Sequence, residues 1–154
     1  MQDRPTAAEL IAAVRAFLET DVMLPAAGQG SLAIECRTAD APRKAGSTEG
    51  SQGVLAQALA ALDDPDTRLA VTAERALLAR LEAGCAAPVG AYAYRKGSML
   101  HLEAVVCAVD GTASVRDKRA TDGLTEVGAT LLGIELAEVL LAGGAADIAD
   151  LQAS

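Results

Sequence analysis

Aromatic side chains are scarce in this chain. Its 154 residues include no tryptophan, one phenylalanine and two tyrosines, so the core has to be built from alanine, leucine and valine. With 51% apolar and 22% charged residues, the composition is that of one ordinary globular domain with some appended structure, and it excludes a disordered chain.

Positive charge is also in short supply. The chain has 13 lysines and arginines against 21 acidic residues, a net charge of −8. Nucleic acids and anionic membranes attract clustered basic residues, and the group Arg116, Lys118 and Arg119 is too small for either. No apolar run approaches the about 20 residues of a spanning helix, and the N-terminus lacks the pattern of a signal peptide. We therefore expect a cytoplasmic protein with neither nucleic acid nor membrane as a partner.

Three cysteines and one histidine are too few, and too scattered, for a disulfide framework or a metal site. Cys36 and Cys107 lie in apolar strand patterns, so both are expected in the core. His101 lies in the predicted strand 99–109 without a serine or aspartate motif to make it a base, so we expect a structural role for it.

An amphipathic helix is predicted over residues 65–82. Asp64 can cap its first amides, and Gly84 can take the left-handed conformation that ends it. Cys85 then falls in a short loop before Pro88, which forbids further helix. The apolar face of the helix consists of Leu69, Ala73, Ala76, Leu77 and Leu81.

Three strands are predicted at residues 89–95, 99–109 and 113–120. Short turn signals at 96–98 and 110–111 make them an antiparallel meander. A helix capped by Asp122 and stopped by Gly143 and Gly144 follows, and a short last helix comes after it. With a further helix from Val54, the fold class is α+β, a three-stranded antiparallel sheet packed against helices, over residues 54–154.

The first third of the chain divides differently. Residues 1–22 hold a capping-box pattern from Thr6 to Glu9, followed by apolar residues at helical spacing, which predicts an N-terminal helix. Residues 23–37 contain a predicted strand at 32–36, and residues 38–53 are predicted to be a mobile loop. That strand has no obvious sheet, so it must pair with the local sheet, dimerise edge to edge or stay loose.

Two runs carry a family resemblance. Residues 74–92, ERALLARLEAGCAAPVGAY, closely resemble the cofactor-attachment region of the porphobilinogen deaminase family, also called hydroxymethylbilane synthases. Residues 24–37, LPAAGQGSLAIECR, resemble that family's return strand, and the two runs have the family's order and about its spacing. The resemblance runs from about Met23 to the C-terminus and covers the last part of a longer protein. Residues 1–22 do not share it, so the N-terminal helical segment is of uncertain origin. It implies the family's third domain, with residues 23–37 as the return strand of an otherwise missing first domain.

The chemistry implied by the resemblance is the joining of four porphobilinogen units, with loss of ammonia at each, to give hydroxymethylbilane in porphyrin biosynthesis. Cys85 matches the residue that carries the covalent dipyrromethane cofactor through a thioether, as an anchor and not as a turnover nucleophile. Gln29 and Gly30 match positions that line the substrate cleft, although a plain turn explains them as well. Arg37 is a further candidate for an anionic partner, or else an ordinary surface charge.

Two functions of different class therefore remain open. One is a transferase of the hydroxymethylbilane synthase family acting on porphobilinogen and oligopyrrole, with a dimer or a second polypeptide supplying the missing domains. The other is a non-catalytic truncated or fused domain, because in the family the catalytic carboxylate and most arginines belong to the first two domains. The carboxylates of the matched runs, Glu35, Glu74 and Glu82, are expected to be solvated or paired on the surface.

Overall fold

The computed structural model describes residues 19–43, 46–84, 87–149 and 151. The predicted N-terminal helix lies outside these residues, apart from the short stretch 19–22. The elements are the 3-10 helix η1 (Thr38–Asp40), helices α2 (Val54–Leu62) and α3 (Pro65–Leu81), strands β1 (Val89–Lys96), β2 (Met99–Cys107) and β3 (Ser114–Thr121), and helices α4 (Glu126–Ala142) and α5 (Ala145–Ile148). The predicted order of helices and strands from Val54 onward is confirmed.

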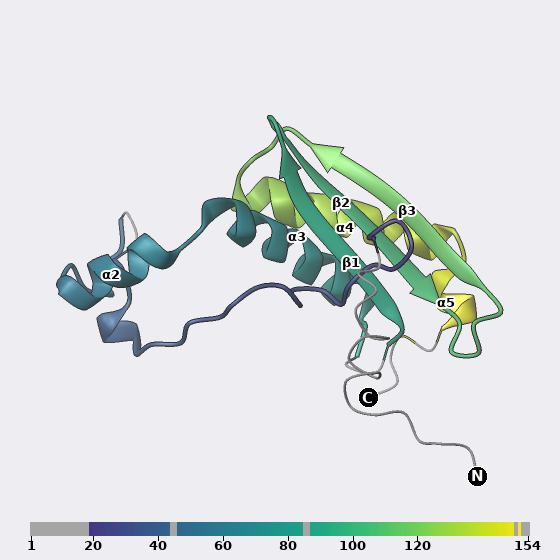
Figure 1. Cartoon of the computed structure of the whole chain (residues 1–154), viewed down its shortest axis with the longest axis horizontal. Helices are drawn as coiled ribbons and strands as arrows, with labels where there is room; N and C mark the ends of the chain where they lie inside the picture. The colour runs from purple at the N-terminus through teal and green to yellow at the C-terminus, as the bar shows by residue number, and fades with distance from the viewer. Residues whose placement is uncertain (1–18, 44–45, 85–86, 150, 152–154) are drawn as a thin grey trace, which may run out of the picture.

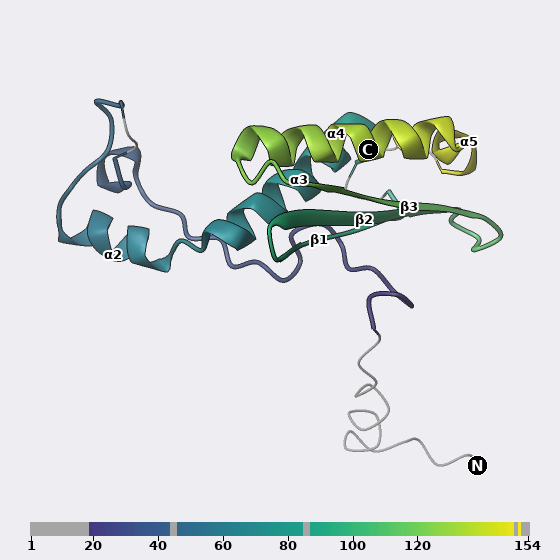
Figure 2. The same cartoon turned by 90° about the horizontal axis from the view of Figure 1, so that it is seen from above.

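The three strands form an antiparallel sheet in the order β1-β2-β3. Val89 pairs with Val106 and Lys96 with Met99, so β1 and β2 form a tight hairpin in full register. Helices α3, α4 and α5 lie on one face of this sheet (Figures 1 and 2). The predicted α+β architecture is therefore confirmed.

Small residues let the core close without large aromatic rings. Alternate residues of β2 point to the helices and are fully buried, among them Leu100 and Leu102. Where α3 and α4 meet, a Cβ atom on Gly133 would lie 2.3 Å from the carbonyl oxygen of Ala73. The two helix backbones thus come closer than any side chain on Gly133 would allow.

Two of the residues predicted to cap or end the helices are wrong, whereas two are confirmed. Asp64 caps α3 by accepting a hydrogen bond from the Thr67 amide at 2.7 Å, and α4 ends before Gly143 as predicted. The left-handed residue at the end of α3 is Glu82 and not Gly84. Thr125, not Asp122, caps α4, because a turn follows β3 before the helix begins.

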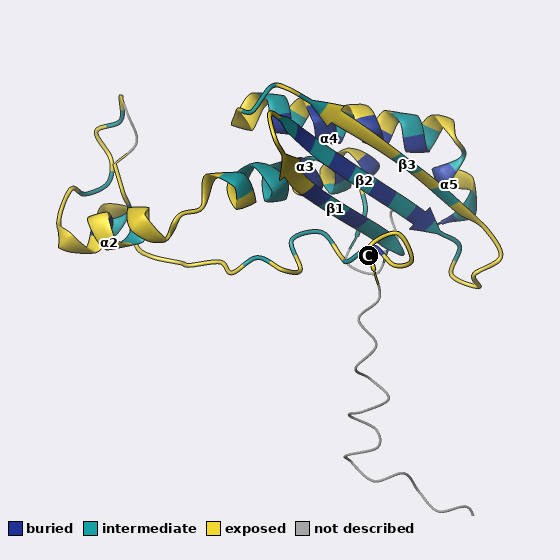
Figure 3. Cartoon of the chain, turned by 45° about the horizontal axis from the view of Figure 1, so that its top comes forward, coloured by how far each residue is buried: buried dark blue, intermediate teal, exposed yellow. Residues whose placement is uncertain are grey.

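The predicted strand 32–36 is absent, because no described strand pairs with it. Leu32 is 97% exposed, and Cys36 is exposed as well. Figure 3 shows that most of the irregular chain leading to α2 is exposed. Without hydrogen-bonded neighbours and a sheet to cover its apolar face, an alternating pattern alone does not make a strand. The prediction of Cys36 as a core residue is therefore wrong.

The segment around α2 stands away from the rest of the fold (Figures 1 and 2). Apart from η1 and a single bridge between Pro42 and Ser51, the described residues of 38–53 are irregular. In α2 only Ala56 is buried. No helix in the described part of the chain is both long and apolar enough to cross a membrane.

Candidate functional site

Cys85 lies outside the described residues, but the residues that flank its loop are placed. The Gly84 amide donates a hydrogen bond to the Leu151 carbonyl at 3.0 Å, and the Cys107 amide donates to the Pro88 carbonyl at 3.0 Å. The loop therefore leaves the end of α3 beside Leu151 and enters β1 where this strand pairs with β2. This agrees with the sequence-based placement of Cys85 between a helix and a strand.

Residues 20–28, here called the strap, lie against the sheet. Leu24 is buried and sits at Gly90, where a Cβ atom would come within 2.9 Å of the Leu24 Cβ. The Ala91 amide donates to the Pro25 carbonyl at 2.9 Å. Further back, the Arg116 guanidinium on β3 donates to the carbonyls of residues 20 and 21, each at 2.8 Å. The strap therefore begins over β3 and ends along the free edge of β1 (Figure 1).

Glu74 on α3 ties the end of the strap to β1. Its side chain is 6% exposed, and its two carboxylate oxygens accept hydrogen bonds from the Gly28 amide at 2.6 Å and the Ala93 amide at 2.7 Å. Burial raises the pKa of the Glu74 carboxyl, while the hydrogen bonds from Ala93 and Gly28 oppose that rise. The expectation of a surface carboxylate is wrong for Glu74, although Glu35 and Glu82 are exposed as expected.

The position of Glu74 could have been found from its spacing. Glu74, Leu77 and Leu81 are three and then four residues apart, so they share one face of α3, and all three are buried. What the sequence could not supply was the pair of donors, because Gly28 is 46 residues away from Glu74.

Gln29 and Gly30 follow the strap in a tight turn. Gly28 has a φ of 72°, and the Gln29 side chain folds back so that its Oε1 accepts a hydrogen bond from the Ala26 amide at 3.0 Å. No atom lies within 4 Å of the place where a Cβ on Gly30 would be. The turn is thus built locally, and both Gln29 and Gly30 face solvent.

The turn and the Cys85 loop are separated along β1. Gly28 is held near Ala93, and at about 3.3 Å per strand residue Ala93 lies about 13 Å from Val89, where the strand begins. The structure brings both predicted regions to the same strand, but at different points on it. A group bound to both has to extend along β1.

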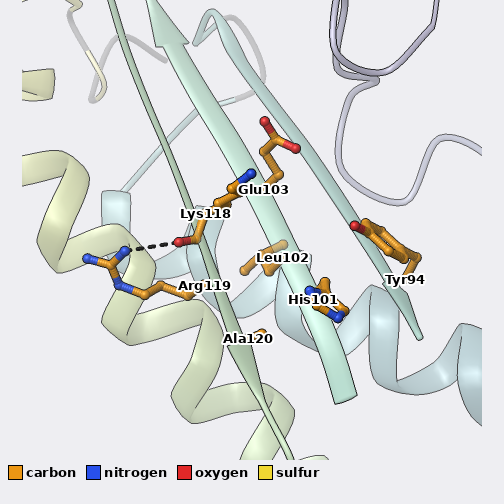
Figure 4. Close-up of a pocket in the computed structure, with 7 residues that line it drawn as sticks. All are labelled: Tyr94, His101, Leu102, Glu103, Lys118, Arg119 and Ala120. Atoms are coloured by element: carbon orange, nitrogen blue, oxygen red, sulfur yellow. Dashed lines mark hydrogen bonds between the residues drawn. The ribbon is translucent and has the colours of Figure 1, made fainter. Parts of the chain in front are cut away.

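The exposed face of the sheet carries a hollow of about 300 Å³ that the sequence did not indicate. Tyr94 stacks on His101 with ring centroids 5.1 Å apart, and on Tyr92 at 5.4 Å. The stacking accounts for His101 as a packing residue, as expected. Figure 4 shows the lining residues, which are Tyr94, His101, Leu102, Glu103, Lys118, Arg119 and Ala120.

The arginines of the described part of the chain are largely committed to acidic partners. Arg37, a candidate for an anionic partner, pairs with Asp40 at 2.8 Å, and its side chain is 87% exposed. Five further arginines pair with carboxylates: Arg68, Arg80, Arg95, Arg116 and Arg119. Among the described residues no group of three or more His, Cys, Asp or Glu side chains could hold a metal ion.

Comparison with known proteins agrees with the fold. Residues 68–142 match the C-terminal domain of porphobilinogen deaminase. The porphobilinogen deaminase of Cutibacterium acnes is 50% identical over 153 residues, covering 92% of this chain and 43% of that protein. That of Acidothermus cellulolyticus is 50% identical over 84% of this chain and 36% of the relative, and that of Thermobifida fusca is 47% identical over 84% and 39%.

This chain therefore spans less than half the length of these relatives. It corresponds to the C-terminal portion of porphobilinogen deaminase, with residues 68–142 matching the C-terminal domain of that family.

Proposed function

We propose that this chain is the cofactor-anchor part of a hydroxymethylbilane synthase, with dipyrromethane bound covalently to Cys85. The observation that carries the proposal is the placement of the Cys85 loop between α3 and β1, inside the stretch that matches the family's C-terminal domain. Because both flanking elements pack in the same domain, a group attached to Cys85 would be anchored between them.

The bond that Cys85 would form balances without a further reagent. Loss of ammonia from porphobilinogen leaves an electrophilic methylene on the pyrrole, and the thiolate sulfur attacks that carbon to form a thioether. The thiol proton leaves with the ammonia as ammonium. The sulfur then stays bound, so Cys85 serves as an anchor through successive additions at the far end of the oligopyrrole.

Gln29 and Gly30 would contact the pyrrole substituents near Ala93 of β1. The open space at Gly30 and the exposed Gln29 amide are consistent with that role. The acetate and propionate groups of an oligopyrrole need cationic partners, and most described arginines already have carboxylate partners. The chain's own residues therefore fit attachment of the cofactor better than binding of its carboxylates.

Catalysis would consequently depend on groups outside this chain. We place the protein in the cytoplasm, in porphyrin biosynthesis, with porphobilinogen and oligopyrrole as its partners. A second polypeptide or a dimer would supply the basic groups that the cleft needs. The alternative is a non-catalytic domain, which the commitment of the arginines favours for the chain on its own.

Mass spectrometry of the purified chain after incubation with porphobilinogen tests the anchor. We expect an added mass of two pyrrole units on the peptide containing Cys85, and none in Cys85→Ala. An adduct on Cys36 or Cys107, or no adduct at all, would contradict the proposal. The adduct separates the two candidates, because only the anchor domain should acquire it. Ammonia release followed on the same samples should stop once the adduct has formed; continued release would show that the chain turns over on its own.

A further inference from the structure

Glu74 is a charged residue that is buried where the strap meets α3 and β1. It is the buried charged residue of the described part of the chain, and burial of a carboxylate is costly unless its oxygens are hydrogen-bonded. Each oxygen has one backbone donor: Oε2 takes the Gly28 amide and Oε1 takes the Ala93 amide. Both oxygens of the side chain therefore accept hydrogen bonds from the backbone, one from the strap and one from β1.

The two donors belong to two neighbouring segments, the strap and β1. Ala93 lies on the edge of β1 that faces away from β2, and a neighbouring strand would normally accept its amide hydrogen. Pro25 accepts from Ala91 on that edge, and Glu74 takes over at Ala93. The carboxylate thus continues the pairing of the strap with β1 at the point where the chain turns away through Gly28.

We propose that Glu74 is a positioning residue, whose carboxylate fixes the turn that carries Gln29 and Gly30 to β1 and so sets its distance from the Cys85 loop on the same strand. The functional part of this inference rests on the proposed roles of Cys85, Gln29 and Gly30. The structural part rests only on the two hydrogen bonds and the burial of Glu74.

A carboxylate fits this task better than its neutral analogue. Glutamine has the same shape, but only one of its two terminal atoms accepts a hydrogen bond, so its amide group would face one backbone amide donor to donor. Because Ala93 is held in a paired strand and Gly28 is at the end of the strap, the Gly28 contact is the one that Glu74→Gln should lose.

Amide hydrogen exchange in the 15N-labelled full chain tests the structural part. In Glu74→Gln we expect exchange at Gly28 to accelerate at least about tenfold, the equivalent of about 1.4 kcal/mol, while the core amide of Leu102 keeps its rate. Glu135→Gln, at an exposed position on α4, is the matched control and should change neither rate. Unchanged protection at Gly28, or equal acceleration at Gly28 and Leu102, would overturn the inference.

The wild-type chain gives the same answer if Glu74→Gln does not fold. Since one carboxylate accepts both hydrogen bonds, the amide chemical shifts of Gly28 and Ala93 should titrate together with a single midpoint. Two different midpoints, or no titration at either amide, would contradict a shared carboxylate.

The functional part is tested by a double-mutant cycle on loading of Cys85 by porphobilinogen. Glu74→Gln should lower adduct formation about as much as Gln29→Ala does, and the double variant should be no worse than either, because both changes disable the same turn. Alkylation of Cys85 by iodoacetamide should stay at the wild-type rate in all three variants, which a general loss of structure would not allow. Additive losses would overturn the positioning role.

The two proposals can fail separately. A wild-type chain that takes up no pyrrole would contradict the proposed function, while the exchange and titration results would still decide whether Glu74 positions the turn. Normal loading with an unprotected Gly28 would contradict the inference and leave the anchor role intact.

Discussion

Leu24 fills the space that Gly90 leaves open on β1. A methyl group on Gly90 would lie 2.9 Å from the Leu24 Cβ and 3.1 Å from the Leu24 carbonyl oxygen. Contacts that short are not tolerated, so one of the two segments has to move. We predict that Gly90→Ala displaces the strap and lowers the free energy of unfolding by about 1 to 3 kcal/mol.

Urea denaturation measures the loss, and limited proteolysis within the strap reports its release. Gly30→Ala is the matched control, because no atom lies within 4 Å of the new methyl group. Equal stability of Gly90→Ala and Gly30→Ala would mean that the strap does not pack against Gly90.

Gly133→Ala tests the close approach of α3 and α4. In an open helix position this change would stabilise the protein by up to about 1 kcal/mol, because alanine is the better helix former. Here the added methyl group would lie 2.3 Å from the Ala73 carbonyl oxygen and 2.8 Å from the Ala76 Cβ. We predict a net loss of about 2 kcal/mol or more in chemical denaturation; a stabilised variant would contradict the observed helix contact.

The raised pKa of Glu74 gives a pH dependence with a defined sign. Burial makes the folded state hold this proton at pH values where the unfolded chain has already lost it. The stabilisation from this group is thus present at low pH and is lost as the pH rises from the ordinary glutamate pKa through the raised one. The difference in unfolding free energy between wild type and Glu74→Gln should fall across that window and then level off.

Denaturation midpoints from about pH 4 to about pH 8 would follow this difference. Subtracting the unfolding free energy of the variant from that of the wild type cancels the contributions of other titrating groups. One of these is Asp64, whose pKa is lowered by hydrogen bonds from Thr67, so that its contribution to stability depends on pH in the opposite sense. A difference that rises with pH would show that the hydrogen bonds from Ala93 and Gly28 outweigh burial.

Thiol labelling should distinguish the described cysteines. Cys36 is exposed in an irregular segment, whereas Cys107 is half-buried at the end of β2. We predict that a maleimide modifies Cys36 much faster than Cys107, with each site followed by peptide mass spectrometry. Comparable rates would indicate that residues 31–37 are covered in solution. We also predict that Cys85, which the sequence places in a loop, is modified before Cys107.

Local sequence patterns were sufficient for the sheet and the helices around it. The turn at Gly97 and the alternation along β2 involve residues close in the chain, so the hairpin could be read directly. Patterns failed where a partner far along the chain decides the outcome. The apolar alternation at 32–36 looks like a strand, but no described strand is available to pair with it, and Cys36 is exposed as a result.

The candidate site was predictable only in part, for the same reason. The Cys85 loop follows from the end of α3 and the start of β1, both local features. The burial of Glu74 could not be predicted, because its donor Gly28 is far away in the sequence. The contact of Leu24 with Gly90 could not be predicted either, because nothing in either segment indicates that the two lie side by side.

The strap and α3 are in contact in the fold but far apart in the sequence. Between Gly28 and Glu74 the backbone extends away from the sheet through α2 and then returns (Figure 2). The strap is therefore comparable to a peptide ligand that is covalently linked to the domain it binds. A covalent connection of this kind raises the effective concentration of the strap at β1 without adding a contact. One cleavage near α2 would remove that advantage, and retention of the strap would then depend on how concentrated the protein is.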